Sequence, residues 1–153
     1  MKGDIIHGQR AVIYQEIPLP NGDRIVFADP DGDRWASLEL ANHNVFRLDA
    51  NNQVVWQVRR VETLGQLNWE VANRRAKEED PACEGYADPF TNMSTRFFEC
   101  RSVPGVGSAP AKQEEIYFDE YAPGRLLWLT THWWAYDLDP ETGIATCNGE
   151  QVK

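Results

Sequence analysis

Residues 126–139 read LLWLTTHWWAYDLD, and this stretch decides the fold that the sequence predicts. It holds three of the six tryptophans of the 153-residue chain. Its pattern also occurs about 90 residues earlier, because residues 46–49 (FRLD) resemble residues 136–139 (YDLD) and a polar turn follows both. Similar hydrophobic patterns with turns in the same places are typical of a repeated unit.

The resemblance extends upstream at an offset of about 91 residues, where Leu38 corresponds to Leu129. We therefore predict a single domain, residues 1–153, with an internal pseudo-repeat. Its two units span about residues 11–61 and 95–148, and a linker helix and loop, about residues 62–94, joins them.

Short runs of alternating or β-branched apolar residues, bounded by Gly, Pro, Asn and Asp, predict strands. The runs are residues 11–17, 24–28, 35–40, 45–49 and 54–60 in the first unit, and 96–103, 115–121, 125–131, 134–138 and 144–147 in the second. Most connections are too short to join anything but antiparallel neighbours. The predicted fold is all-β and mainly antiparallel, with about ten short strands in two similar five-stranded meanders. They would form a barrel or a two-sheet sandwich, since both hide sheet edges.

The linker contains the only predicted helix. Leu67 and Val71 lie at helical spacing, and Pro81 ends the segment. Leu67, Trp69 and Val71 also alternate as in a strand, but we favour a helix over residues 66–79.

Composition indicates a soluble globular protein, with 42% hydrophobic and 25% charged residues. The net charge of −9 repels phosphate backbones and anionic lipids, so we expect neither nucleic-acid nor membrane binding. The sequence contains no run of 18 apolar residues, and residues 1–10 lack the apolar core of a secretory signal. A cytoplasmic location is the expectation.

The sequence predicts no metal site and no cofactor. Cys83, Cys100 and Cys147 have no C-x-x-C spacing, and their odd number favours free thiols. Residues 29–33 (DPDGD) offer three carboxylates, but the glycine is fourth, whereas a calcium-binding EF-hand loop has its glycine sixth. We interpret this segment as a turn.

Catalytic residues stay unassigned. The three histidines, His7, His43 and His132, share no metal-ligand spacing. Asp137 could orient His132 as a general base across their predicted hairpin, but that hairpin offers no serine or cysteine nucleophile. Exposed turn histidines are the simpler interpretation.

The tryptophans give the best functional signal. In the first unit Trp35 begins a face that is otherwise polar, whereas the corresponding face of the second unit, with Leu126 and Trp128, is apolar. A strand that is apolar on both faces should be covered on both, by the helix, a partner subunit or a ligand. The candidate ligand or partner surface comprises Trp35, Leu126, Trp128, His132 and Trp133.

We therefore expect a non-catalytic ligand-binding or protein-interaction module that uses this aromatic surface. One alternative is a small enzyme with carboxylate and histidine acid–base chemistry in a barrel mouth. Another is a homo-oligomeric structural protein with Leu126 and Trp128 at a two-fold interface. The expected partner is a second copy or a small ligand of unknown identity.

Overall fold

The computed structural model describes residues 3–6, 9–30, 38–61, 74–75, 77–79 and 88–151. The described chain is mostly antiparallel β-structure, which confirms the predicted fold class. None of its sheets closes into a barrel, and two five-stranded sheets share a core, so the two-sheet alternative fits better. None of its helices combines the length and apolarity needed to cross a membrane.

The first sheet is an antiparallel meander in which each strand pairs with the next. Its strands are β1 (Gly3–Ile6), β2 (Gln9–Pro18), β3 (Arg24–Pro30), β4 (Val45–Leu48) and β5 (Val54–Gln57). Helix α1 (Leu38–Asn42) lies between β3 and β4 in the sequence, and the buried Leu40 belongs to the apolar cluster on one face of this sheet.

The second sheet combines strands from distant parts of the chain in the order β6-β12-β11-β10-β7. These are β6 (Arg59–Val61), β7 (Asn92–Met93), β10 (Leu127–Thr130), β11 (Trp134–Leu138) and β12 (Ile144–Gln151). Strands β6 and β12 pair in parallel, while the other neighbours are antiparallel. The second predicted meander is therefore wrong in detail, because two strands from outside it border this sheet.

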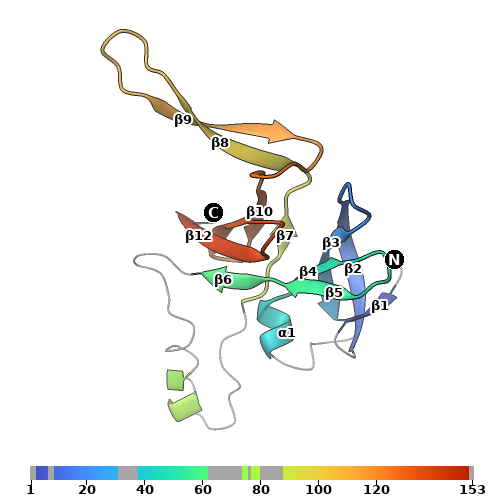
Figure 1. The fold of residues 1–153 in the computed structure, drawn as a ribbon. Coiled ribbons are helices and arrows are strands. Elements are labelled where there is room, and N and C mark those ends of the chain that lie inside the picture. The colour runs from blue at the N-terminus through green and yellow to red at the C-terminus, as the bar shows by residue number, and fades with distance from the viewer. Residues whose placement is uncertain are drawn as a thin grey trace.

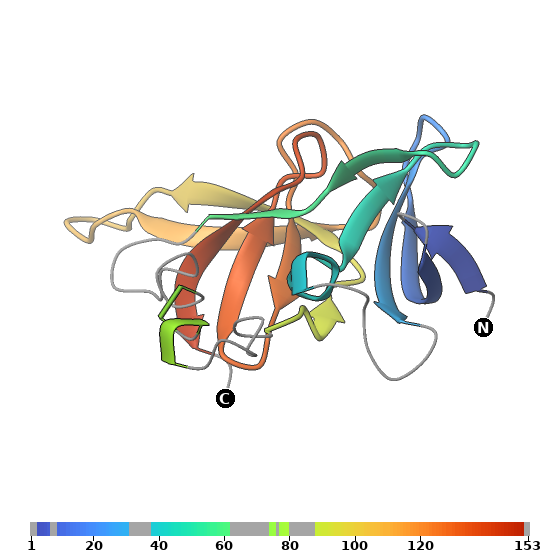
Figure 2. The ribbon, with the colours of Figure 1, turned by 90° about the horizontal axis from the view of Figure 1, so that it is seen from below.

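The chain passes from one sheet to the other between β5 and β6 (Figure 2). Val58 N–H donates to Val45 O of the first sheet at 2.9 Å, and Arg59 N–H donates to Gly143 O, beside β12, at 2.8 Å. Val58 is buried between them in the core that the two sheets share. This crossing sets the second sheet beside the first.

Two polar contacts fix the hairpin turns of the two sheets against each other. Pro140 O, in the β11–β12 turn, accepts from Arg47 Nη1 at 2.9 Å and from Trp56 Nε1 at 2.8 Å. Arg47 also donates through Nε to Asp23 Oδ2 at 2.8 Å. Buried donors need such partners, so the turn geometry determines how the sheets meet.

A buried ion pair also joins distant parts of the chain. Arg60 Nη2 is 3.1 Å from Asp88 Oδ2, and both side chains are only 4% exposed. Arg60 also donates to Asp88 O at 2.7 Å and to Tyr136 Oη at 2.8 Å. Asp88 N–H donates to Asn42 Oδ1 at 2.7 Å. The network joins α1, β6, β11 and the segment before β7.

One predicted strand is wrong where the structure describes it. Residues 38–40 belong to α1, whereas the sequence predicted a strand over residues 35–40. Leu, Glu and Ala have high helix propensity, and Leu38 and Ala41 are three residues apart, which also fits one helical turn. Strand β1 was not predicted.

The linker helix is described only near its end, where residues 74–75 and 77–79 are helical. The predicted packing of Leu67 and Val71 lies outside the described residues.

The pseudo-repeat stays a prediction, and the two units share one local feature in their last hairpins. Asp49 and Asp139 open equivalent turns, in which their side chains accept the N–H groups of Asn51 and Glu141. Upstream the correspondence fails at one position, because Leu38 begins a helix while Leu129 lies in β10. The wider repeat stays a prediction.

We expect Arg60→Ala to lower the free energy of unfolding by about 3–5 kcal/mol, because it leaves the Asp88 carboxylate buried and unpaired. Arg96→Ala is the control, since Arg96 pairs with Asp119 at an exposed site and its loss should change stability by about 1 kcal/mol or less. Urea unfolding measures both. Equal losses would contradict a structural role for the buried pair.

Gly143→Ala should destabilise the fold more than Gly124→Ala does. Both glycines have positive φ, +76° and +90°, so both variants carry a backbone strain of about 1–2 kcal/mol. A Cβ at Gly143 would also lie 2.6 Å from the Trp56 ring, whereas Gly124 faces open space. That contact should add about 1–3 kcal/mol. Equal unfolding midpoints would show that the hairpins are not docked as described.

Candidate functional site

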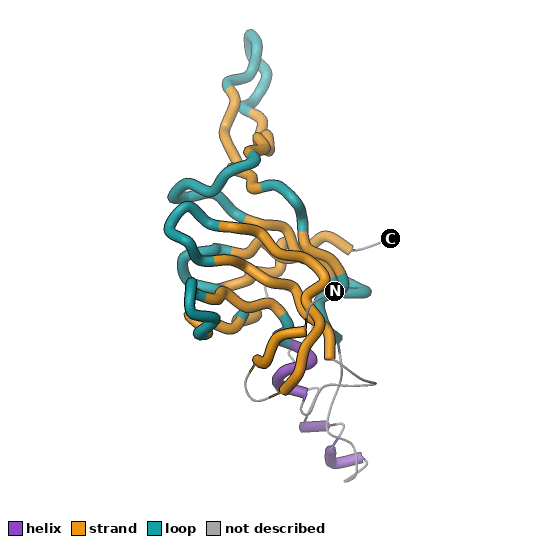
Figure 3. The backbone as a smooth tube through the Cα atoms, turned by 90° about the vertical axis from the view of Figure 1, so that its right-hand side faces the viewer, coloured by secondary structure: helices purple, strands orange, loops and turns teal. Residues whose placement is uncertain are grey.

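A two-stranded arm projects from the two five-stranded sheets (Figures 1 and 3). It consists of β8 (Phe97–Val103), the loop of residues 104–111 and β9 (Lys112–Phe118). The two strands pair antiparallel over their full length. An isolated hairpin is marginally stable in water, so the anchoring of its base decides whether it persists.

The base of the arm is joined to β10. Phe98 N–H donates to Leu126 O at 2.9 Å, and Leu126 N–H donates to Phe98 O at 2.8 Å. Across β8 and β9, Phe98 lies opposite Tyr117. Directly opposed residues point to the same side of paired strands, so Phe98, Tyr117 and Leu126 share a side. Trp128 lies two residues after Leu126 and therefore points the same way. We call Phe98, Tyr117, Leu126 and Trp128 the aromatic face.

The aromatic face is only partly covered. Phe98 is buried and Leu126 is half-buried, whereas Tyr117 and Trp128 are 49% and 37% exposed. The rings of Phe98 and Tyr117 are 6.4 Å apart. The arm thus covers part of the apolar strand that the sequence predicted to need cover, and large aromatic area remains in water.

Carboxylates border the aromatic face. Asp137 lies directly opposite Trp128, and Glu115 lies two residues before Tyr117, whose hydroxyl donates to it at 2.5 Å. Cys100, an exposed free thiol opposite Glu115, is close enough to both carboxylates to respond to them. Its pKa is raised by burial and by the charges of Glu115 and Asp137.

On the opposite side of the arm, arginine side chains pair with a carboxylate and an aromatic ring. The Arg125 guanidinium lies 3.5 Å from the centre of the Phe118 ring, and Arg101 lies 5.7 Å from it. Arg101 and Arg125 both bind Glu99, at 2.6 and 3.3 Å. The hydrogen bond from Arg101 is the main reason that the pKa of Glu99 is lowered. On this side Glu99 is paired with two guanidinium groups, whereas Glu114, opposite Arg101, forms no ion pair with a described cation.

The structure brings together only part of the predicted surface. Leu126 and Trp128 share the aromatic face, while His132 and Trp133 lie in the β10–β11 turn, both exposed. The Thr131 hydroxyl accepts the N–H groups of Trp133 and Trp134 there. Trp35 lies outside the described residues.

Phe98 and Tyr117 were missed by the sequence analysis. The consecutive aromatic residues Phe97 and Phe98 could have been a signal, because neighbours in a strand point to opposite faces and both faces must then be apolar. Nothing local in the sequence indicates that Phe98 pairs with Leu126.

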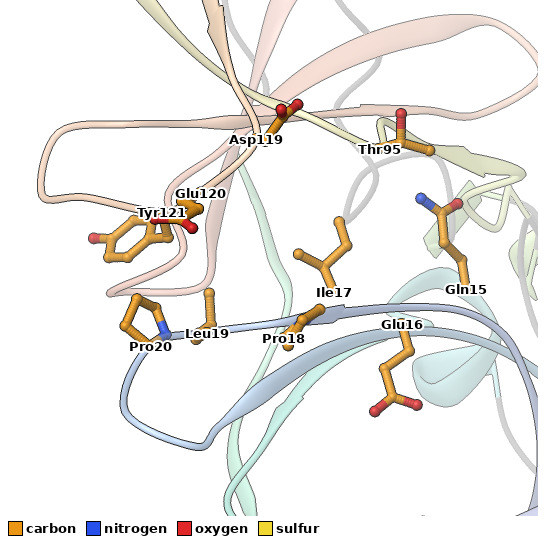
Figure 4. A pocket seen from close by; sticks show the side chains of 10 residues that line it. All are labelled: Gln15, Glu16, Ile17, Pro18, Leu19, Pro20, Thr95, Asp119, Glu120 and Tyr121. Atoms are coloured by element: carbon orange, nitrogen blue, oxygen red, sulfur yellow. The ribbon is translucent and has the colours of Figure 1, made fainter.

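A second candidate is an open cleft of about 430 Å³ between the first sheet and the base of the arm (Figure 4). Its lining comes from β2, the following turn, the β7–β8 connection and the β9–β10 connection: Gln15, Glu16, Ile17, Pro18, Leu19, Pro20, Thr95, Asp119, Glu120 and Tyr121. Glu16 points away from the other side chains and pairs with Arg24 at 3.1 Å. The cleft has an apolar floor and an acidic rim.

The cleft offers weak chemistry. Tyr121 donates to Glu141 Oε1 at 2.7 Å, and burial followed by this carboxylate raises its pKa, which keeps the phenol protonated. The described lining residues include no histidine, cysteine, serine or lysine. Within the described ranges, no group of three His, Cys, Asp or Glu side chains is arranged to hold a metal ion.

Comparison with known proteins finds no match to this chain among protein-family models, curated proteins or solved structures.

The pKa of Cys100 tests the geometry of the aromatic face. Because burial and two carboxylates raise that pKa, alkylation of Cys100 should begin at higher pH than alkylation of a cysteine in a short peptide. Glu115→Gln and Asp137→Asn should each shift the profile toward lower pH, since each removes a negative charge that opposes the thiolate. Site-resolved mass spectrometry of alkylation rates across pH measures this. A pH profile unaffected by Asp137→Asn would show that Cys100 does not lie close to Asp137 of β11.

Proposed function

We propose that this chain is a non-catalytic interaction module that binds a partner through the aromatic face. The observation that carries the proposal is the exposure of Tyr117 and Trp128, 49% and 37%, in two sheets that the Phe98–Leu126 bridge joins. Tyrosine and tryptophan are enriched at binding hot spots because they offer large area at a low entropic cost. An exposed aromatic patch with a polar border is typical of an interaction site.

The arm supports the same proposal. It contributes Phe98 and Tyr117 to the surface, yet most of its residues are exposed and add little to the shared core. A projecting hairpin that stabilises the domain so little is well suited to contact another molecule. The acidic border, Glu115 and Asp137, favours a partner with complementary positive charge.

The alternatives make different predictions. A small enzyme would use the cleft, where Tyr121 stays protonated. A homo-oligomeric structural protein would place the aromatic face against a second copy. The cytoplasmic location and the pseudo-repeat are also proposals, and the repeat is supported by the matching turns at Asp49 and Asp139.

Selection of a displayed library of random twelve-residue peptides on the full chain tests the proposed function. We expect the enriched peptides to bind Trp128→Glu at least about tenfold more weakly, because the substitution places a charge in the contact. Trp133→Glu is the matched control, since it makes the same change at a more exposed tryptophan in the β10–β11 turn.

Unchanged circular dichroism and unfolding midpoints of both variants confirm that the fold persists. Peptides that lose affinity only for Trp133→Glu would move the surface to the turn. Peptides sensitive to neither variant would contradict the proposal. A doubled molar mass in light scattering, lost with Trp128→Glu, would instead identify a homo-oligomer.

A further inference from the structure

Strand β9 is an open edge. Across the described ranges it pairs with β8 on one side and with no strand on the other. It is seven residues long, contains no proline and projects with the arm beyond the sandwich (Figure 1). Unpaired edge strands are templates for an additional strand, and proteins protect the edges that they do not use with proline, bulges or short length. Within the described ranges, β9 is protected by its charges and by one side chain, Arg96, which donates to Tyr117 O.

The pairing of Phe98 determines which backbone groups of β9 point outward. Phe98 gives its N–H and C=O to Leu126, away from β9. Its partner Tyr117 is therefore in a non-hydrogen-bonded pair, so the backbone groups of Tyr117 point away from β8. Because the direction of the backbone groups alternates along a strand, those of Glu115 and Gln113 also point away from β8. The outer edge thus presents the N–H and C=O groups of three alternate residues, and Arg96 Nη2 is 3.5 Å from Tyr117 O there.

The edge is acidic. Residues 112–120 contain four carboxylates and one lysine. Asp119 forms an exposed ion pair with Arg96 at 3.0 Å, whereas no described cation forms an ion pair with Glu114, Glu115 or Glu120. Charges next to a strand edge select the strand that can pair with it, because like charges placed opposite each other are destabilising.

A second copy of the chain fits this edge poorly. Full antiparallel pairing of β9 with its own copy places Glu115 opposite Glu115, with Glu114 beside it. Each chain also carries a net charge of −9. Both features oppose self-association and favour a basic occupant.

We propose that the outer edge of β9 binds an extended basic segment of a partner protein as an added strand. This inference rests on the proposed function and names the partner's chemistry. Backbone hydrogen bonds to Gln113, Glu115 and Tyr117 would give affinity, and lysine or arginine opposite Glu115 would give selectivity. One side of the added strand would lie beside Tyr117 and extend the contact to the aromatic face.

The probe is a fluorescein-labelled peptide of sequence Thr-Arg-Val-Lys-Val-Lys-Val-Thr, and a version with Glu at the three basic positions is the control. Fluorescence anisotropy at low salt should show binding of the basic peptide only. Amide exchange of the isotope-labelled full chain should show new protection of Gln113, Glu115 and Tyr117 in the complex. Equal binding of the acidic peptide, no binding up to about 1 mM, or protection elsewhere would overturn the proposal.

Two matched pairs of variants separate the edge from its side chains. Gln113→Pro removes one outward N–H without removing a bond to β8, and Gln113→Ala removes the same side chain but keeps the N–H. We expect Gln113→Pro to weaken peptide binding about tenfold relative to Gln113→Ala. Glu115→Gln should weaken binding about threefold, whereas Glu99→Gln, on the other side of the arm, should not.

Equal affinities of Gln113→Pro and Gln113→Ala would overturn strand addition. If Gln113→Pro disturbs the amide signals of β8, exchange protection in the wild-type complex decides the matter instead. The two proposals can be distinguished. Library peptides that depend on Trp128 while the outer edge of β9 stays unprotected would overturn strand addition and leave the proposed function standing.

Discussion

The buried contact between Arg60 and Asp88 holds the described parts of this fold together. Arg60 lies just after the chain crosses between the sheets, and its guanidinium stacks on Phe90 and Tyr136 at 5.0 and 4.9 Å. Further hydrogen bonds support such a buried pair, and here the guanidinium also donates to Asp88 O and to Tyr136 Oη. The pair places residues 88–90, which lead into β7 and the arm. We therefore expect loss of the buried pair to disturb the segment that leads to the arm.

Local pattern in the sequence was enough to predict the strands but not their partners. Apolar runs bounded by turn residues around Phe46 and Tyr136 correctly indicated two hairpins, although β4 is buried on both faces. It could not indicate that β6 adds in parallel to β12, since that pairing depends on contacts between distant residues. The missed helix α1 has the same cause: over five residues, strand and helix patterns coincide and tertiary packing of Leu40 decides.

The candidate site was predicted to a similar degree. Leu126 and Trp128 were proposed because β10 carries apolar residues on both faces, whereas a strand with one solvent-exposed face carries polar residues there. Their neighbours Phe98 and Tyr117 were not found. The Phe98–Leu126 bridge joins residues far apart in the sequence, and a local pattern cannot predict such a pairing. The acidic character of β9 was visible in the composition. Its significance depends on the arm being an edge, which only the topology shows.

The central claim is that the arm is a preformed hairpin whose outer edge is open. Residue-resolved amide exchange of the free chain, at low and high protein concentration, tests it most directly. The account predicts alternation along β9, with the amides of Glu114, Ile116 and Phe118 exchanging roughly tenfold more slowly than those of Gln113, Glu115 and Tyr117 at both concentrations. Uniform protection of all six amides would show that the edge is already covered. Uniform fast exchange would show that the hairpin is not formed.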